Sequence, residues 1–285
     1  MSDRTAASPA SSGAALRAAG RAAIAVATAI LLMSSAQAAM AAAAVPAEAP
    51  PAPPTWSVNL YDPSVVRLQN PDRTACVAAA TVSMLGIISL SPLGDTPPVG
   101  SSIPIVSFRW AASNGYATQE RVQEFERRHM TMSSHFKGGD PHGWRNALNY
   151  FGWGSINAGV YRDVGYPSFA TATKAAVNAL ARIGKPVGVV GWSGAHAQYI
   201  TGYVVTGEDP RISSNYSIVG VYMSDPLRRI EMPNNFIPLA EWKSGPEEIA
   251  FSRYEQFGSD RVDPVDGQIG DIEWYHKWVL VEPVE

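Results

Sequence analysis

The residue of this chain best suited to act as a nucleophile is Cys76, its single cysteine. A lone thiol has no disulfide partner, so either its reactivity or its packing must account for it. The apolar spacing of residues 74–88 predicts a helix capped by Asp72 or Thr74, which puts Cys76 in the first turn. Unpaired N–H groups and the helix dipole favour a thiolate nucleophile there. Free cysteine is also among the most buried residue types, so core packing is the alternative.

A catalytic thiol needs a nearby base that also protonates the leaving group. His196 is the best placed of the five histidines, because it begins a predicted strand after residues 191–195, a run rich in small side chains. Such a run lets a substrate approach closely. The other four are interpreted as structural or surface residues: His129, His135, His142 and His276. His196 is therefore the predicted base and acid for Cys76.

A third group would orient the imidazole and hold its tautomer. Asp225 ends the predicted strand that follows the strand of His196, so the two lie side by side if these strands pair as a hairpin. Asp209 is closer to His196 in sequence but falls in the loop between the strands. Asp225 is the predicted orienting residue, and Asp209 is the alternative.

Attack on a carbonyl group creates an oxyanion that needs hydrogen-bond donors. Gln69 precedes Cys76 by seven residues on a segment that leads into the predicted helix, so its side-chain amide can reach the same pocket. Together with the backbone N–H of Cys76 it would form the oxyanion hole. Asn70 is the substitute for Gln69.

The order Gln69, Cys76, His196, Asp225 resembles the papain-like cysteine peptidases of the bacteriocin-processing type and their exported bacterial relatives. Three segments between residues 60 and 240 carry the resemblance: Gln69-x6-Cys76, Gly194-Ala195-His196-Ala197-Gln198-Tyr199-Ile200-Thr201-Gly202-Tyr203, and Met223-Ser224-Asp225-Pro226. It implies an α+β, papain-like fold, in which a Cys-bearing helix of an N-terminal helical half packs on a C-terminal antiparallel sheet. It also implies a Cys-His-Asp mechanism with an acyl-thioester intermediate, peptide or amide substrates and no cofactor, with Gln69 as oxyanion donor.

The pattern of the whole chain is a helical part followed by a strand-rich part, with no internal repeat. Further helices are predicted over residues 118–130, 140–152 and 168–183, with Gly152 and Gly184 as the stops of the last two. Strands are predicted over four segments rich in Val, Ile, Tyr and Trp, namely 187–192, 195–206, 216–224 and 274–282. This arrangement is typical of an α+β domain.

Two other kinds of catalytic site fit the sequence poorly. Ser193 lacks the final glycine and the strand-to-helix context of a G-x-S-x-G nucleophile. A metal site would draw on the set His129, His135, Asp140 and His142. The spacing of these histidines in a loop-rich stretch does not match helical metal-ligand spacing, so no metal is expected.

Two further functions use the same fold. An inactive papain-like binding module of the cell envelope would use aromatic residues to line its cleft: Trp153, Trp192, Tyr199 and Tyr203. An acyltransferase would pass the acyl group of the Cys76 thioester to an amine instead of water. Sequence does not separate transfer from hydrolysis, because both share the first half-reaction.

The first 38 residues have the pattern of a secretory signal, with Arg residues before an apolar run and Ala36-Gln37-Ala38 as cleavage site. The apolar stretch 22–44 could also serve as an uncleaved anchor. Residues 39–55 are Ala/Pro-rich and predict a disordered linker, which leaves 56–285 as one peptidase-like domain. We expect a secreted or envelope-associated protein with no later membrane span. The net charge of −3 gives no support for nucleic-acid binding.

Overall fold

The computed structural model describes residues 52–61, 74–90, 118–132, 137–227 and 233–284. The predicted signal segment, residues 39–51 of the predicted linker, and Gln69, Asn70, Asp72 and His135 lie outside these ranges. Pro51–Glu285 forms one compact unit. No helix within the described ranges combines the length and apolar composition needed to cross a membrane.

The unit is built on a seven-stranded antiparallel sheet with the strand order β2-β7-β3-β4-β5-β6, and β1 pairs with β4 off this path. The strands are β1 (Thr55–Asn59), β2 (Tyr161–Tyr166), β3 (Val187–Gly191), β4 (His196–Gly207), β5 (Tyr216–Ser224), β6 (Asn235–Pro238) and β7 (Trp278–Pro283). The helices are α1 (Cys76–Leu90), α3 (Gln119–His129), α4 (Pro141–Trp153), α5 (Phe169–Ile183), α6 (Leu239–Ser244) and α7 (Gly270–Trp274), with a 3-10 turn η1 (Trp192–Gly194). The predicted α+β class is confirmed.

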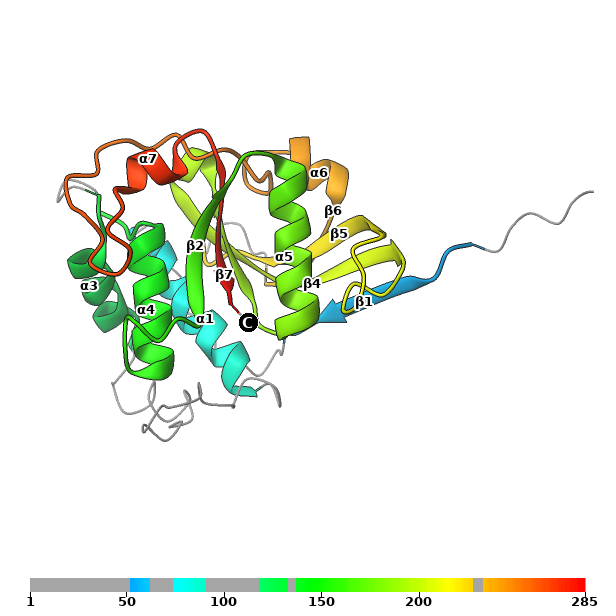
Figure 1. Cartoon of the computed structure of the whole chain (residues 1–285), viewed down its shortest axis with the longest axis horizontal. Coiled ribbons are helices and arrows are strands. Elements are labelled where there is room, and N and C mark those ends of the chain that lie inside the picture. The colour runs from blue at the N-terminus through cyan, green and yellow to red at the C-terminus, as the bar shows by residue number, and fades with distance from the viewer. Residues whose placement is uncertain (1–51, 62–73, 91–117, 133–136, 228–232, 285) are drawn as a thin grey trace, which may run out of the picture. The chain divides into compact units, whose positions relative to one another are not determined.

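Helices cover both faces of the sheet. Figure 1 shows how these helices lie around the sheet. The side chains of α1, α3 and α4 form one apolar cluster with the sheet, and those of α5 and α6 form a second cluster. Strand β7 shows how this division arises, because Val279 and Val281 belong to the first cluster and Leu280 to the second. Alternate residues of a strand point to opposite faces, so an unbroken apolar run marks a strand buried on both sides.

The bounds of the helix predicted over 168–183 agree closely with those of α5 in the structure. Ser168 caps α5 by accepting a hydrogen bond from Thr171 N, and the Thr171 side chain accepts one from Ser168 N. Gly184 ends the helix with φ 71°. Strand β5 also has the predicted bounds. Local capping and composition were sufficient to predict these two elements.

The predicted stop at Gly152 is wrong. Helix α4 continues to Trp153 and ends at Gly154, which has φ 79° and donates its N–H to Tyr150 O. A Cβ at Gly152 would come within 2.9 Å of Leu85 Cδ2 on α1. Gly152 therefore allows α4 to approach α1 closely instead of ending the helix.

The strand predicted over 274–282 begins too early. Trp274 is the last residue of α7, and the chain turns through His276, with φ 60°, before β7 starts at Trp278. Trp274 is fully buried and packs on Tyr254 instead of pairing in the sheet. Its bulk indicates burial, which a helix end satisfies as well as a strand.

The division into a helical part and a later strand-rich part omits three strands. Strand β2 lies between α4 and α5 in sequence and pairs with β7. Strand β6 pairs with β5, and β1 begins at Thr55, the last residue of the predicted linker. These strands have four to six residues each and lie outside the segments rich in Val, Ile, Tyr and Trp from which the other strands are predicted.

Candidate active site

Cys76 is the first residue of α1 and is 5% exposed. The residues 78–80 behind it are fully buried alanines, so the start of the helix packs closely in the first apolar cluster. Helix α3 holds the same end, because the Gln123 side chain donates from Nε2 to Thr74 Oγ1 at 3.1 Å. The predicted position of Cys76 in a first helical turn is confirmed.

The turn η1 precedes His196 and has a strained backbone. Trp192 and Ser193 have φ of 51° and 53°, a left-handed region that L-residues seldom occupy, and Gly194 has φ 93°. Ser252 stabilises the turn by accepting a hydrogen bond from Ser193 N at 2.7 Å. Strained backbone positions persist where the surrounding structure enforces them. Here they turn the chain so that His196 begins β4 at the candidate site.

His196 is hydrogen-bonded to Asp225, with Nε2 2.9 Å from each carboxylate oxygen. The pairing of β4 with β5 brings the two residues together, since Tyr199 lies opposite Ser224. A side-chain hydrogen bond also joins His196 to Cys76. Because Nε2 faces the carboxylate, Nδ1 is the ring nitrogen left for the thiol. Cys76, His196 and Asp225 therefore form one connected set.

The protonation of His196 is set by opposing effects. Burial lowers the pKa of His196, but the hydrogen bonds to Asp225 and Cys76 and the charges of both groups outweigh burial and raise the pKa to about 9. The imidazole therefore keeps its extra proton at neutral pH. The Trp192 ring covers it, with ring centroids 4.4 Å apart, and limits its contact with solvent.

Asp225 is itself held by two donors. Gln198 donates from Nε2 to Asp225 Oδ2 at 2.7 Å and also to Glu248 O at 2.6 Å, and Leu227 N donates to Asp225 Oδ1 at 2.6 Å. Gln198 was not predicted as part of the site. The signal was present, because residues two apart on a strand share a face and Gln198 follows His196 by two.

The alternative orienting residue, Asp209, lies at the far end of β4. The strand runs from His196 to Gly207, which at about 3.3 Å per residue separates its ends by about 35 Å. Asp209 instead accepts hydrogen bonds from Arg211, including one from Nη2 at 2.6 Å. The structure therefore places Asp225, and not Asp209, beside the imidazole.

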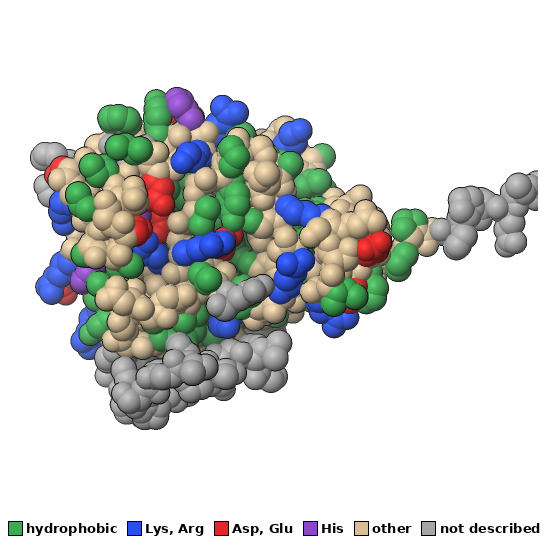
Figure 2. Space-filling model, in the orientation of Figure 1, with side chains coloured by type: hydrophobic (Ala, Val, Ile, Leu, Met, Phe, Trp, Pro, Cys, Tyr) green, Lys and Arg blue, Asp and Glu red, His purple; other side chains and the backbone are tan. Residues whose placement is uncertain are grey.

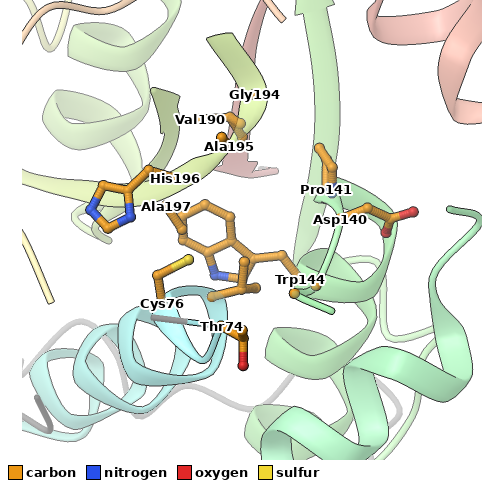
Figure 3. A pocket seen from close by; sticks show the side chains of 13 residues that line it. Thr74, Cys76, Asp140, Pro141, Trp144, Val190, Gly194, Ala195, His196 and Ala197 are labelled. Atoms are coloured by element: carbon orange, nitrogen blue, oxygen red, sulfur yellow. The ribbon is translucent and has the colours of Figure 1, made fainter. Parts of the chain in front are cut away.

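A pocket of about 130 Å³ opens beside Cys76 and His196 (Figure 3). Its other walls come from the start of α1, the start of α4 and the segment before it, β3, the turn η1 and the start of β4. The residues are Thr74, Val77, Gly138, Gly139, Asp140, Pro141, Trp144, Val190, Gly194, Ala195 and Ala197. Asp140 caps α4 by accepting from Gly143 N at 2.7 Å. Small residues on both sides leave backbone accessible to a bound chain.

A buried carboxyl group lies behind this pocket. Glu126 on α3 is 1% exposed, and a Cβ at Gly139 would meet its Oε2 at 3.1 Å. Burial raises the pKa of Glu126 well above 4.5, although its hydrogen bond with Thr81 has a lowering effect. Thr81 Oγ1 lies 2.9 Å from both Glu126 Oε1 and Val77 O. One hydroxyl proton cannot serve both acceptors, so a protonated Glu126 donating to Thr81 satisfies the arrangement.

A second group of charged side chains lies apart from Cys76. His142 Nδ1 is 3.1 Å from Asp163, and Arg145 lies 2.9 Å from Asp163 and 2.5 Å from Asp263. Figure 2 shows acidic and basic side chains together on the surface over α4 and α7, where this group reaches solvent. Among the described residues, His142 could join Asp163 and Glu273, or Asp263 and Asp266, around a metal ion. The Arg145 guanidinium already pairs with Asp163, Asp263 and Asp266, so we interpret this group as an ion-pair network.

The remaining predicted residues have structural positions. Ser193 serves through its backbone in η1. Of the four aromatic residues considered for a ligand cleft, three are buried in the apolar clusters, namely Trp153, Tyr199 and Tyr203. The fourth, Trp192, covers the imidazole of His196.

No protein-family model, curated protein or solved structure matches this chain. Its function is therefore inferred from the residues of the site.

Proposed function

We propose that this chain is a thiol-dependent hydrolase of papain-like fold that cleaves peptide or amide bonds through an acyl-thioester on Cys76. The observation that carries the proposal is that the His196 side chain hydrogen-bonds to two partners, Asp225 and Cys76. Nε2 is bound by Asp225, and a hydrogen bond joins the same side chain to Cys76. A base that is oriented by one group and contacts a thiol with its other nitrogen is the arrangement that nucleophilic catalysis requires.

The first half-reaction follows from this geometry. The Cys76 thiolate attacks the substrate carbonyl carbon, and the π electrons move to oxygen to give a tetrahedral oxyanion. When this intermediate collapses, the C–N bond breaks and the imidazolium of His196 gives its proton to the departing amine. The raised pKa of His196, about 9, keeps that proton available at neutral pH.

In the second half-reaction water replaces the amine. Neutral His196 takes a proton from the attacking water, the C–S bond breaks, and the carboxylic acid leaves with Cys76 restored as thiolate. Asp225 stabilises the imidazolium in both halves without receiving the proton. Each residue thus returns to its starting state.

The arrangement of elements supports the papain-like part of the proposal. Helix α1 carries Cys76 at its N-terminus and contacts β4, the strand that begins with His196. Asp225 follows the neighbouring antiparallel strand β5. The predicted export signal over residues 1–38 supports a secreted or envelope-associated enzyme.

The walls of the pocket favour an extended peptide or amide substrate. Gly138 and Gly139 line one side, and Gly194 and Ala195 line the other. Small side chains leave backbone N–H and C=O groups open to hydrogen-bond a substrate main chain. The pocket is small, so the residue that binds next to Cys76 should have a short side chain.

The test is hydrolysis of a mixture of peptidyl 7-amino-4-methylcoumarin amides by the full chain. We expect coumarin release by the wild-type chain, and loss of release in Cys76→Ala and His196→Ala. Added hydroxylamine should be acylated in competition with water, because both attack the same thioester. Release that persists in Cys76→Ala, or a wild-type chain inert toward every amide, contradicts the proposal; the second result favours an inactive binding module.

A further inference from the structure

The indole of Trp144 has an unused hydrogen-bond donor inside the candidate active site. Trp144 is fully buried, and its Nε1 has no hydrogen-bond partner among the described residues. The residue lines the pocket together with Cys76 and His196. Figure 3 shows the indole ring in the pocket, with its nitrogen on the edge toward Cys76. A buried N–H without a partner costs free energy, so its retention at this place needs an explanation.

The position of this indole is fixed from two sides. Trp144 lies in the first turn of α4, which Asp140 caps. On the opposite side, a Cβ at Gly188 of β3 would come within 2.7 Å of Trp144 Cη2 and Cζ2. Only glycine at position 188 leaves room for the six-membered ring of Trp144 to pack against β3. Such a rigid placement is what a preorganised donor requires.

We propose that Trp144 Nε1–H is the side-chain donor of the oxyanion hole. This inference rests on the proposed function. The second donor is the backbone N–H of Cys76, which has no partner within the helix because it is the first residue of α1. Cys76 and Trp144 line the same pocket, and the proposal places the carbonyl oxygen of a substrate bound beside Cys76 between these two donors.

The chemistry matches a donor that acts on developing charge. When the Cys76 thiolate adds to the carbonyl carbon, the C=O π pair becomes a lone pair on oxygen, and the N–H of Trp144 hydrogen-bonds that oxygen without giving up its proton. An indole N–H is a donor only, so it cannot bind the free thiol's proton or compete as a base. Removing one oxyanion donor typically slows such reactions by about 10²- to 10³-fold.

The experiment separates thiol reactivity from oxyanion stabilisation in the full chain. Iodoacetamide alkylates a thiolate without forming an oxyanion, whereas 4-nitrophenyl acetate acylates it through one. Trp144→Phe removes the N–H, and 3-benzothienylalanine at position 144 removes it while keeping the shape of the ring. Trp242→Phe is the matched control, because Trp242 is also fully buried with an unpartnered Nε1 but belongs to the other apolar cluster.

We expect both changes at Trp144 to slow acylation by about 10²-fold while alkylation stays within about threefold of wild type. Trp242→Phe should alter neither rate. Full acylation with benzothienylalanine would overturn the inference, and would point to Gln69 or the backbone as sufficient. An equal fall in both rates would also overturn it, because Trp144 would then support the thiol itself. A wild-type chain that is alkylated but not acylated would contradict the proposed function itself. A loss of acylation confined to the Trp144 variants would support the inference, so the two results are distinguishable.

Discussion

His196 Nε2 lies 2.9 Å from both carboxylate oxygens of Asp225, although 29 positions separate the two residues in sequence. The antiparallel pairing of β4 and β5 creates this contact, and Gln198 holds the carboxylate from the same strand as the histidine. The carboxylate in turn keeps the imidazole protonated beside Cys76. The stability of the fold and the proposed chemistry therefore depend on the same pair.

Replacing the carboxylate should change how stability depends on pH. The pKa of His196 is raised from 6.5 to about 9, so its contribution is complete below pH 6.5 and is lost as pH rises through about 9. That contribution is at most about 3 kcal/mol. Asp225→Asn should remove most of it, so the free energies of unfolding in urea should differ strongly at pH 6 and converge near pH 9.5. Parallel curves for the two chains would contradict the assigned pairing.

Glu126 should destabilise the fold as pH rises, which is the reverse of a salt-bridged carboxylate. Above pH 4.5 the unfolded chain releases the Glu126 proton and the folded chain keeps it, because burial raises the folded pKa. Unfolding free energy then falls by at most about 1.4 kcal/mol per pH unit until the folded pKa is reached. Glu126→Gln keeps a donor for Thr81 and removes the titration. The variant should gain stability over wild type between pH 5 and pH 8, measured by urea unfolding; a constant difference would show that Glu126 is ionised in the fold.

The ion-pair network around Arg145 should be sensitive to loss of its cation. Arg145→Met leaves Asp163 and Asp263 buried without that positive charge, and we expect a loss of about 3–5 kcal/mol in unfolding free energy. Arg128→Met is the control, because Arg128 pairs with Glu124 one helical turn away on α3 and the two side chains are 69% and 63% exposed. The control should lose about 1 kcal/mol or less. Equal losses of unfolding free energy would contradict the view that burial makes the Arg145 ion pairs important for stability.

Local signals predicted the elements with clear caps or strand composition. Ser168 and Gly184 bounded α5 correctly, and the position of Cys76 at a helix start followed from the apolar spacing after it. Gly152 was misinterpreted because a glycine that ends a helix and one that lets two helices approach look the same in sequence. Only the contact with Leu85 separates the two roles.

The parts of the site that were not predicted depend on contacts between distant segments. Glu126 lies in the helix predicted over 118–130, whose sequence is mostly polar, yet its side chain is buried behind Gly139. A tryptophan such as Trp144 indicates burial in sequence, but its free N–H is visible only in the folded structure, where Gly188 of β3 lies against the indole. The predicted oxyanion donor Gln69 lies outside the described residues and stays a prediction.

The central claim is that Cys76 and His196 act as a pair, and the most direct measurement is the rate of alkylation of Cys76 by iodoacetamide at pH 6.5. Cys76 is the only cysteine, so the mass of the intact chain reports its modification alone. We predict that wild type reacts faster than free cysteine, that His196→Ala slows the reaction by about tenfold or more, and that His276→Ala, a change at an exposed histidine beside Glu255, has no effect. Equal rates in wild type and His196→Ala would contradict the account.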